Sequence, residues 1–339
     1  MPVFFLLSGE NPALSAAELQ HLLTIYISNP SFKIIDERIA VAEVGDEVAK
    51  KIVFRAAYTK AAAKLIAQGV STEDLAFRPD WRELCQDFHT FEVSVVKLGE
   101  TYVHSVEVEK QIAKHILSEL PHLRINLSNP EVTFLTAVSA GHVAVGRLIA
   151  SKPKLFFADR KAGIRPFRIP SALQPKLARC LVNLSVLNDS SKVLDPFAGS
   201  GAVVVEAGLM GHESVGIELK TWISEGMKRN VETYSHSTCH VIQADSRHLP
   251  FRKAFDSVAT DPPYGRSATL AGMSFKTLFK RFAEEVLNIL NQKARIAVTV
   301  PTTYYSDLID ACEGFRHEAY FDLYVHKSLT RRVVVIVHE

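Results

Sequence analysis

The chain has 339 residues, which is long enough for two or three domains with hydrophobic cores of their own. Its composition is that of an ordinary globular protein, 47% hydrophobic and 22% charged with a formal net charge of +2, and it contains no low-complexity tract or obvious repeat. Because no apolar stretch approaches the roughly 20 residues that a membrane-spanning helix needs, we expect a cytoplasmic protein without a membrane segment.

Residues 1–54 predict a small α+β domain. Its expected elements are a strand at 3–8, a helix at 12–23, strands at 34–35 and 39–44, and a helical region at 48–64. Residues 55–150 predict a second unit in the order strand, helix, strand, strand. Its expected elements are a strand at 90–96, a helix at 108–120, and strands at 132–138 and 142–147.

A basic segment at residues 151–168 follows, which we interpret as a linker. It contains one acid, Asp159, and six cations, namely Lys152, Lys154, Arg160, Lys161, Arg165 and Arg168. A solvated linker would explain them. Because the segment lies between two candidate nucleic-acid modules, we favour a strip that binds RNA phosphates.

Residues 169–339 alternate strands and helices. The expected strands are 192–194, 214–217, 239–243, 257–260, 294–300, 319–324 and 332–337, and the expected helices are 173–186, 202–210, 221–234 and 275–290. This alternation predicts an α/β fold of the Rossmann-like type, a doubly wound parallel sheet. The last two strands suit an antiparallel hairpin at its edge.

The sequence DPFAGSG at residues 195–201 follows the first of these strands and predicts a cofactor loop. Gly199 and Gly201 let the backbone approach a ligand, and the following helix start favours a carboxylate. A dinucleotide fingerprint needs another glycine at position 204, which is Val204. We therefore expect S-adenosylmethionine, with Asp195 able to pair with its ammonium group.

Acids at the ends of the next two strands extend this site. Glu218 lies where such folds accept the ribose hydroxyls, and Asp245 could meet the adenine amine. The complete set expected to bind the cofactor is Asp195, Phe197, Gly199, Gly201, Glu218, Leu219, Asp245, Ser246 and Asp261.

The sequence DPPYG at residues 261–265 follows the fourth strand and predicts the reacting half of the site. The exocyclic amine of guanine or adenine is a poor nucleophile, so its N–H groups need acceptors. Asp261 and the Pro262 carbonyl can supply them. Tyr264 offers a face on which an unstacked base can lie, worth about 1–3 kcal/mol. A capped turn would explain the same residues, but the cofactor loop favours catalysis by Asp261, Pro262 and Tyr264.

Four dispersed cysteines without a CxxC pair, and 13 histidines without HxxxH or HxH spacing, predict no metal site and no disulfide framework.

The segments DPFAGSGAVVVEA, VGIEL, QADSRHLPF and TDPPYG resemble, in this order, class I S-adenosylmethionine-dependent amino-methyltransferases. The preceding RPFRIPSALQPKLARCLVNL is similar to RNA guanine N2-methyltransferases with a THUMP domain. The start FFLLSGENPALSAAEL and the end VHKSLTRRVVVIV resemble the archaeal and eukaryotic tRNA guanosine-10 N2-methyltransferase family. Ala198 and Ser200 stand where relatives frequently have Cys and Thr, and Glu218 stands where Asp is common.

The resemblance implies a ferredoxin-like domain at 1–54, a THUMP domain at 55–150 and a methyltransferase domain at 169–339. The THUMP domain would bind the acceptor end of tRNA and present a guanosine for mono- or dimethylation. Members of this kind can also pair with a small zinc-binding activator protein, so the resemblance implies such a partner besides tRNA.

Two other enzymes and one binding protein stay as alternatives. The DPPY motif also permits methylation of an amine in DNA, and a THUMP methyltransferase could act on another tRNA or ribosomal RNA guanosine. A non-catalytic RNA-binding protein would need a damaged site, whereas the expected cofactor and DPPY residues are all present.

Overall fold

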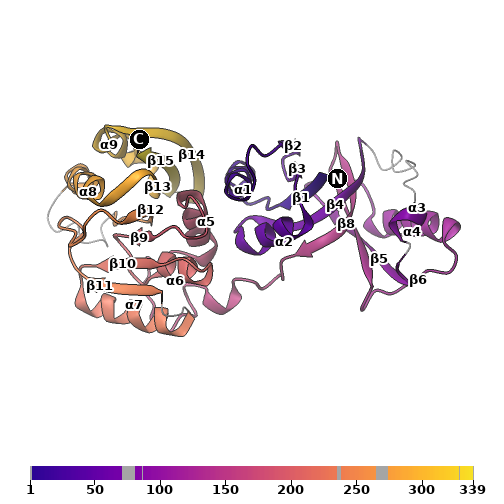
Figure 1. Cartoon of the computed structure of the whole chain (residues 1–339), viewed down its shortest axis with the longest axis horizontal. Helices are drawn as coiled ribbons and strands as arrows, with labels where there is room; N and C mark the ends of the chain where they lie inside the picture. The colour runs from indigo at the N-terminus through magenta and orange to yellow at the C-terminus, as the bar shows by residue number, and fades with distance from the viewer. Residues whose placement is uncertain are drawn as a thin grey trace. The chain divides into compact units, whose positions relative to one another are not determined.

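A computed structural model describes residues 2–70, 81–85, 87–234, 238–264, 274–327 and 329–338. The chain forms two compact units, residues 1–153 and 154–339 (Figure 1). None of the described helices combines the length and the apolar character needed to cross a membrane.

The first unit contains one eight-stranded sheet with helices packed on it. Its elements are β1 (Pro2–Leu7), α1 (Pro12–Tyr26), β2 (Phe32–Asp36), β3 (Ile39–Glu43), α2 (Asp46–Arg55), β4 (Thr59–Gly69), α3 (Trp81–Leu84), β5 (Thr90–Lys97), α4 (Ser105–Glu119), β6 (Arg124–Ile125), β7 (Val132–Val138) and β8 (Val143–Ser151). The strand order is β2-β3-β1-β4-β8-β7-β5-β6. Because β4 pairs antiparallel with both β1 and β8, the regions 1–54 and 55–150 share this sheet.

The helical region expected at 48–64 was wrong in its second half. Helix α2 ends at Arg55, and Thr59 begins strand β4. The segment Ala61–Ala63 has high helix propensity, but the sheet buries it on both sides. Ala62 packs with the core under α1 and α2, and Ala61 and Ala63 pack on the opposite face. Tertiary packing therefore overrides a weak local preference.

The second unit is a seven-stranded sheet flanked by helices. Its elements are α5 (Pro175–Ser185), β9 (Val193–Asp195), α6 (Ala202–Leu209), β10 (Ser214–Glu218), α7 (Thr221–Tyr234), β11 (Cys239–Gln243), β12 (Phe255–Thr260), α8 (Phe275–Ile289), β13 (Leu290–Pro301), α9 (Tyr305–Ala311), β14 (Phe315–His326) and β15 (Leu329–His338). The strand order is β11-β10-β9-β12-β13-β15-β14.

The predicted doubly wound sheet with an antiparallel edge hairpin is confirmed. Strand β9 pairs in parallel with both β10 and β12, so the order of the strands reverses at β9. Strand β15 pairs antiparallel with β13 and with β14. The sequence did not predict the short helix α9.

A single core holds the centre of this sheet in place. Phe279, Phe282 and Val286 of α8 belong to the same buried cluster as Val258 of β12 and Ile296 of β13. Parallel strands β9, β10, β11 and β12 consequently present their carboxyl ends at one edge of the sheet, where open α/β folds bind ligands.

Candidate active site

The loop between β9 and α6 forms the first part of the site. It turns through Gly199 with φ +50° and Gly201 with φ +83°, both in the left-handed region that suits glycine. The amide of Ala198 donates to the carbonyl of Ile217 at 2.9 Å, which ties the loop to β10. A Cβ on Gly201 would lie 2.8 Å from a side-chain atom of Met227 in α7, so the loop also packs tightly against α7.

Asp195 ends β9 and is almost fully buried, with 3% of its surface exposed. Its Oδ1 accepts hydrogen bonds from Thr260 Oγ1 at 2.7 Å and from the Phe197 amide at 3.2 Å. Burial outweighs these bonds and raises the pKa of Asp195 to about 7. A cation beside this carboxyl would favour its ionised form.

The acids after β10 and β11 lie at the same edge. A carboxylate oxygen of Glu218 accepts from the Lys220 amide at 2.9 Å, and the Glu218 carbonyl accepts from the Ala244 amide at 3.2 Å. Arg247 Nε donates to both oxygens of Asp245, at 2.8 and 2.9 Å. This guanidinium lowers the pKa of Asp245, so Asp245 is held as a carboxylate.

The turn after β12 forms the second part of the site. Asp261 accepts a hydrogen bond from Thr299 Oγ1 of β13 through its Oδ1, and its Oδ2 lies 3.7 Å from the Arg331 guanidinium of β15. Burial raises the pKa of Asp261, while the charge of Arg331 opposes this rise. The ring of Tyr264 lies 5.6 Å from the guanidinium carbon of Arg331. Gly265 lies outside the described residues.

A cavity of about 610 Å³ joins the two parts of the site. Nearly all of the expected cofactor and catalytic residues line it, namely Asp195, Phe197, Gly199, Glu218, Leu219, Asp245, Ser246, Asp261, Pro262 and Tyr264. Gly201 is not among the lining residues and contributes through the shape of the loop. The structure thus brings the DPFAGSG and DPPY segments to one hollow.

Sequence reasoning missed the residues that the β14–β15 hairpin brings to this cavity. His326, Leu329 and Arg331 all line it. The only signal in the sequence was the TRR segment before the last apolar strand. The position of Arg331 is set by the antiparallel pairing of β15 with β13, where Arg331 lies opposite Pro301. This long-range pairing decides which acid Arg331 faces.

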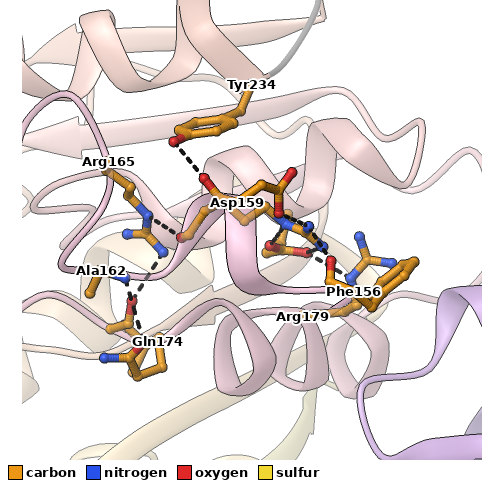
Figure 2. A network of polar contacts seen from close by, with 10 residues as sticks. Phe156, Asp159, Ala162, Arg165, Gln174, Arg179 and Tyr234 are labelled. Carbon is orange, nitrogen blue, oxygen red and sulfur yellow. Dashed lines mark hydrogen bonds and ion pairs between the residues drawn. The ribbon is translucent and has the colours of Figure 1, made fainter. Parts of the chain in front are cut away.

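The predicted RNA-binding strip is wrong for Arg160 and Arg165, which are buried with 5% and 1% exposure. Arg160 Nε donates to Glu206 Oε1 at 2.6 Å, and Arg179 Nε donates to Glu206 Oε2 at 2.6 Å. Figure 2 shows this network, in which Tyr234 Oη also donates to the Asp159 carbonyl at 3.0 Å. A guanidinium paired inside the core cannot reach a phosphate group.

Arg165 links the segment before α5 to the cofactor loop. Its guanidinium donates to the carbonyls of Arg160 at 3.0 Å and Leu173 at 3.2 Å, and it lies 3.5 Å from Ser200 Oγ. Asn230 of α7 adds a second link, because its Nδ2 donates to the Ser200 carbonyl at 2.9 Å. Much of the expected linker therefore belongs to the packed structure around the cofactor loop.

Three of the six cations, Lys154, Lys161 and Arg168, are exposed. Lys152 is partly buried in the first unit, where its ammonium group donates to the Ala56 carbonyl. The exposed set stays available to a polyanion.

This combination of sheet and site defines the class of the second unit, a class I S-adenosylmethionine-dependent methyltransferase. The lining residues fit that cofactor. Glu218 would accept from the ribose hydroxyls, Asp245 would accept from the adenine amine, and buried Asp195 would pair with the ammonium group.

Comparisons with known proteins agree with this assignment. Residues 162–332 match the family described as RMKL-like, methyltransferase domain, and residues 72–146 match the THUMP domain. The tRNA (guanine(10)-N2)-dimethyltransferase of Methanothermobacter thermautotrophicus is 31% identical over 99% of both chains. The protein of the same name from Pyrococcus abyssi is 35% identical over 76% of both chains.

The chain therefore belongs to the tRNA (guanine(10)-N2)-methyltransferase family of THUMP-domain proteins. Among solved structures, TrmN from Thermus thermophilus matches with a TM-score of 0.58 at 22% identity, over 100% of both chains. That likeness supports the fold.

Proposed function

We propose that this protein transfers the methyl group of S-adenosylmethionine to the exocyclic N2 amine of a guanosine in tRNA, at position 10. The observation that carries the proposal is that one cavity is lined both by Asp261 of the DPPY turn and by the three expected cofactor acids, Asp195, Glu218 and Asp245. The relatives' activity, named as guanine(10)-N2 dimethylation, supports the choice of base and position.

S-adenosylmethionine would supply an electrophilic methyl group to this cavity. The protein's task is then to hold the amine and to remove a proton from it. Asp261 Oδ2 and the Pro262 carbonyl would accept the amine hydrogens, since Thr299 already donates to Asp261 Oδ1. Burial raises the pKa of Asp261, which suits its Oδ2 to take the proton that the amine releases.

The target guanine has to leave its stack to reach Asp261. Tyr264 would hold the unstacked base against its ring. The THUMP domain, which we place at 55–150, would bind tRNA. Exposed Lys154, Lys161 and Arg168 would add contacts to its phosphates.

Asp261→Ala tests the assignment of the reacting group. We expect methyl transfer from tritiated cofactor into tRNA transcript to fall at least 1,000-fold, because the amine loses its acceptor, within the range that removal of a catalytic acid or base costs. Binding of tRNA should stay within about twofold. Asp310→Ala is the matched control, since Asp310 is 59% exposed and pairs with Lys276 on the surface. Near-full activity of the Asp261 variant would contradict the mechanism.

The substrate itself is tested with two transcripts and one DNA duplex. A tRNA in which adenosine replaces guanosine 10 should accept no methyl group, and nucleoside mass spectrometry of exhausted reactions should show whether one or two methyl groups are added. Label found only in duplex DNA would overturn the proposal.

A small zinc-binding activator and a cytoplasmic location complete the proposal. The family resemblance supports the activator, and a tRNA substrate supports the location. Full activity of the purified chain alone would show that the activator is dispensable.

A further inference from the structure

Arg331 holds a position that the methyl-transfer mechanism above leaves without a task. It lies near the start of β15 and lines the cavity beside the DPPY turn. Its guanidinium lies 3.7 Å from Asp261 Oδ2, which is longer than a hydrogen bond, and 5.6 Å from the centre of the Tyr264 ring. The guanidinium charge of Arg331 therefore lies next to the Asp261 carboxylate that would receive the amine, but the two groups are not hydrogen-bonded to each other.

One buried atom of this side chain, Arg331 Nε, has no hydrogen-bond partner among the described residues. Buried polar groups in native proteins nearly always have partners, so this donor is an exception that calls for an explanation. The neighbouring Arg332 is different, because its Nε and one terminal nitrogen donate to Asp322 at 2.6 and 2.8 Å.

Asp261 and Arg331 together present an acceptor beside a donor. Thr299 donates to Asp261 Oδ1, and the other oxygen, Oδ2, is the one that lies 3.7 Å from the guanidinium. Along its pairing edge guanine carries the N2 amine, the N1–H group and then the O6 acceptor. A carboxylate oxygen that accepts from the N2 amine and from N1–H, with a guanidinium beyond them at O6, matches this order. In adenine and in 2,6-diaminopurine N1 is an acceptor, so the same carboxylate would face a second acceptor there.

We propose that Arg331 is a specificity-determining residue, which donates to O6 of the target guanine while Asp261 accepts from the adjacent N–H groups. This inference rests on the proposed function. Arginine also donates to guanine O6 in the major groove of DNA, where it binds O6 together with N7. The Arg331 side chain is 19% exposed and its terminal nitrogen lies 3.7 Å from Asp261 Oδ2, so this nitrogen can donate to a ligand without first breaking a hydrogen bond to that carboxylate.

The test uses two synthetic tRNAs that differ only in the target base, with the same uridine opposite it. One carries guanosine, and the other carries 2,6-diaminopurine riboside, which keeps the 2-amino group and replaces O6 with an amine. We expect the wild-type protein to prefer guanosine by about 10- to 100-fold in kcat/KM, the range of one well-placed arginine–guanine contact. Arg331→Met should reduce this preference to about threefold or less, since the donor that reads O6 is gone.

Arg332→Met is the matched control and should keep the wild-type preference. Affinity for S-adenosylhomocysteine, measured by calorimetry, should be unchanged in both variants and reports that the cofactor cavity is intact. If Arg331→Met does not fold, Arg331→Lys replaces it, because lysine keeps the charge and a hydrogen-bond donor. Its preference for guanosine in kcat/KM should be smaller than that of the wild type but greater than onefold.

Three results separate the possibilities. A variant that loses rate equally on both tRNAs, with its preference retained, would mean that Arg331 only supports Asp261, and the inference would be wrong. A wild-type protein that methylates both tRNAs equally would also overturn it. A wild-type protein that methylates neither would instead contradict the proposed function.

Discussion

Glu206→Gln should destabilise the second unit through the buried ion network. The Glu206 carboxylate has 1% exposure and pairs with Arg160 and Arg179, whose side chains have 6% and 5% exposure. Breaking a buried ion pair costs about 3–5 kcal/mol, because an unpaired charge stays in the core. Arg160 keeps the Phe156 carbonyl at 2.7 Å and Asp159 at 2.9 Å, so we expect the low end, about 3 kcal/mol.

Thermal unfolding of the full chain measures this cost. For a unit of this size, a loss of about 3 kcal/mol lowers the melting temperature by roughly 6–12 °C. Glu213→Gln is the matched control, because Glu213 pairs with Lys192 where both side chains are more than 40% exposed. Such a pair contributes about 0–1 kcal/mol. Equal shifts for the two variants would refute the reasoning that burial makes the Glu206 charge indispensable.

The remaining predictions concern the cofactor loop and the basic segment. The pKa of Asp195 is raised to about 7, so its neutral form stabilises the fold at low pH and this contribution is lost as pH rises through about 7. In thermal melts without cofactor, the stability of Asp195→Asn relative to the wild type should therefore increase between pH 5 and pH 8. The same difference in melting temperature at both pH values would refute the pKa shift. Gly201→Ala should cost more in chemical unfolding than Gly211→Ala, since both have φ above +80° but only the first crowds a neighbour; equal costs would show that strain alone matters. Lys154→Glu with Lys161→Glu should weaken tRNA binding and reduce the slope of log affinity against log salt by about 1–2. An unchanged slope would mean that these lysines contact no phosphate.

The acids of the site were predictable because they depend on local order along the chain. Asp195, Glu218, Asp245 and Asp261 each follow a short apolar run, and a parallel sheet brings the ends of such runs to one edge. The glycine turn was predictable for the same reason, since backbone conformation at Gly199 is a local property.

The fate of the basic residues was not predictable from their sequence. Arg165 and Lys161 are four positions apart in one cationic segment, yet the first is buried and the second exposed. The difference comes from partners far along the chain. Glu206 pairs with the buried Arg160, and Ser200 lies beside the buried Arg165.

By itself, then, the sequence determined the order of strands and helices in the second unit, the cofactor loop and the DPPY turn, since each strand, helix and turn is encoded within a few neighbouring residues. Only the tertiary structure decided that Ala61–Ala63 form a strand, that Arg160 and Arg165 lie inside the fold, and that Arg331 faces Asp261. These outcomes depend on which surfaces pack together, because burial and charge pairing are set by residues distant in the chain.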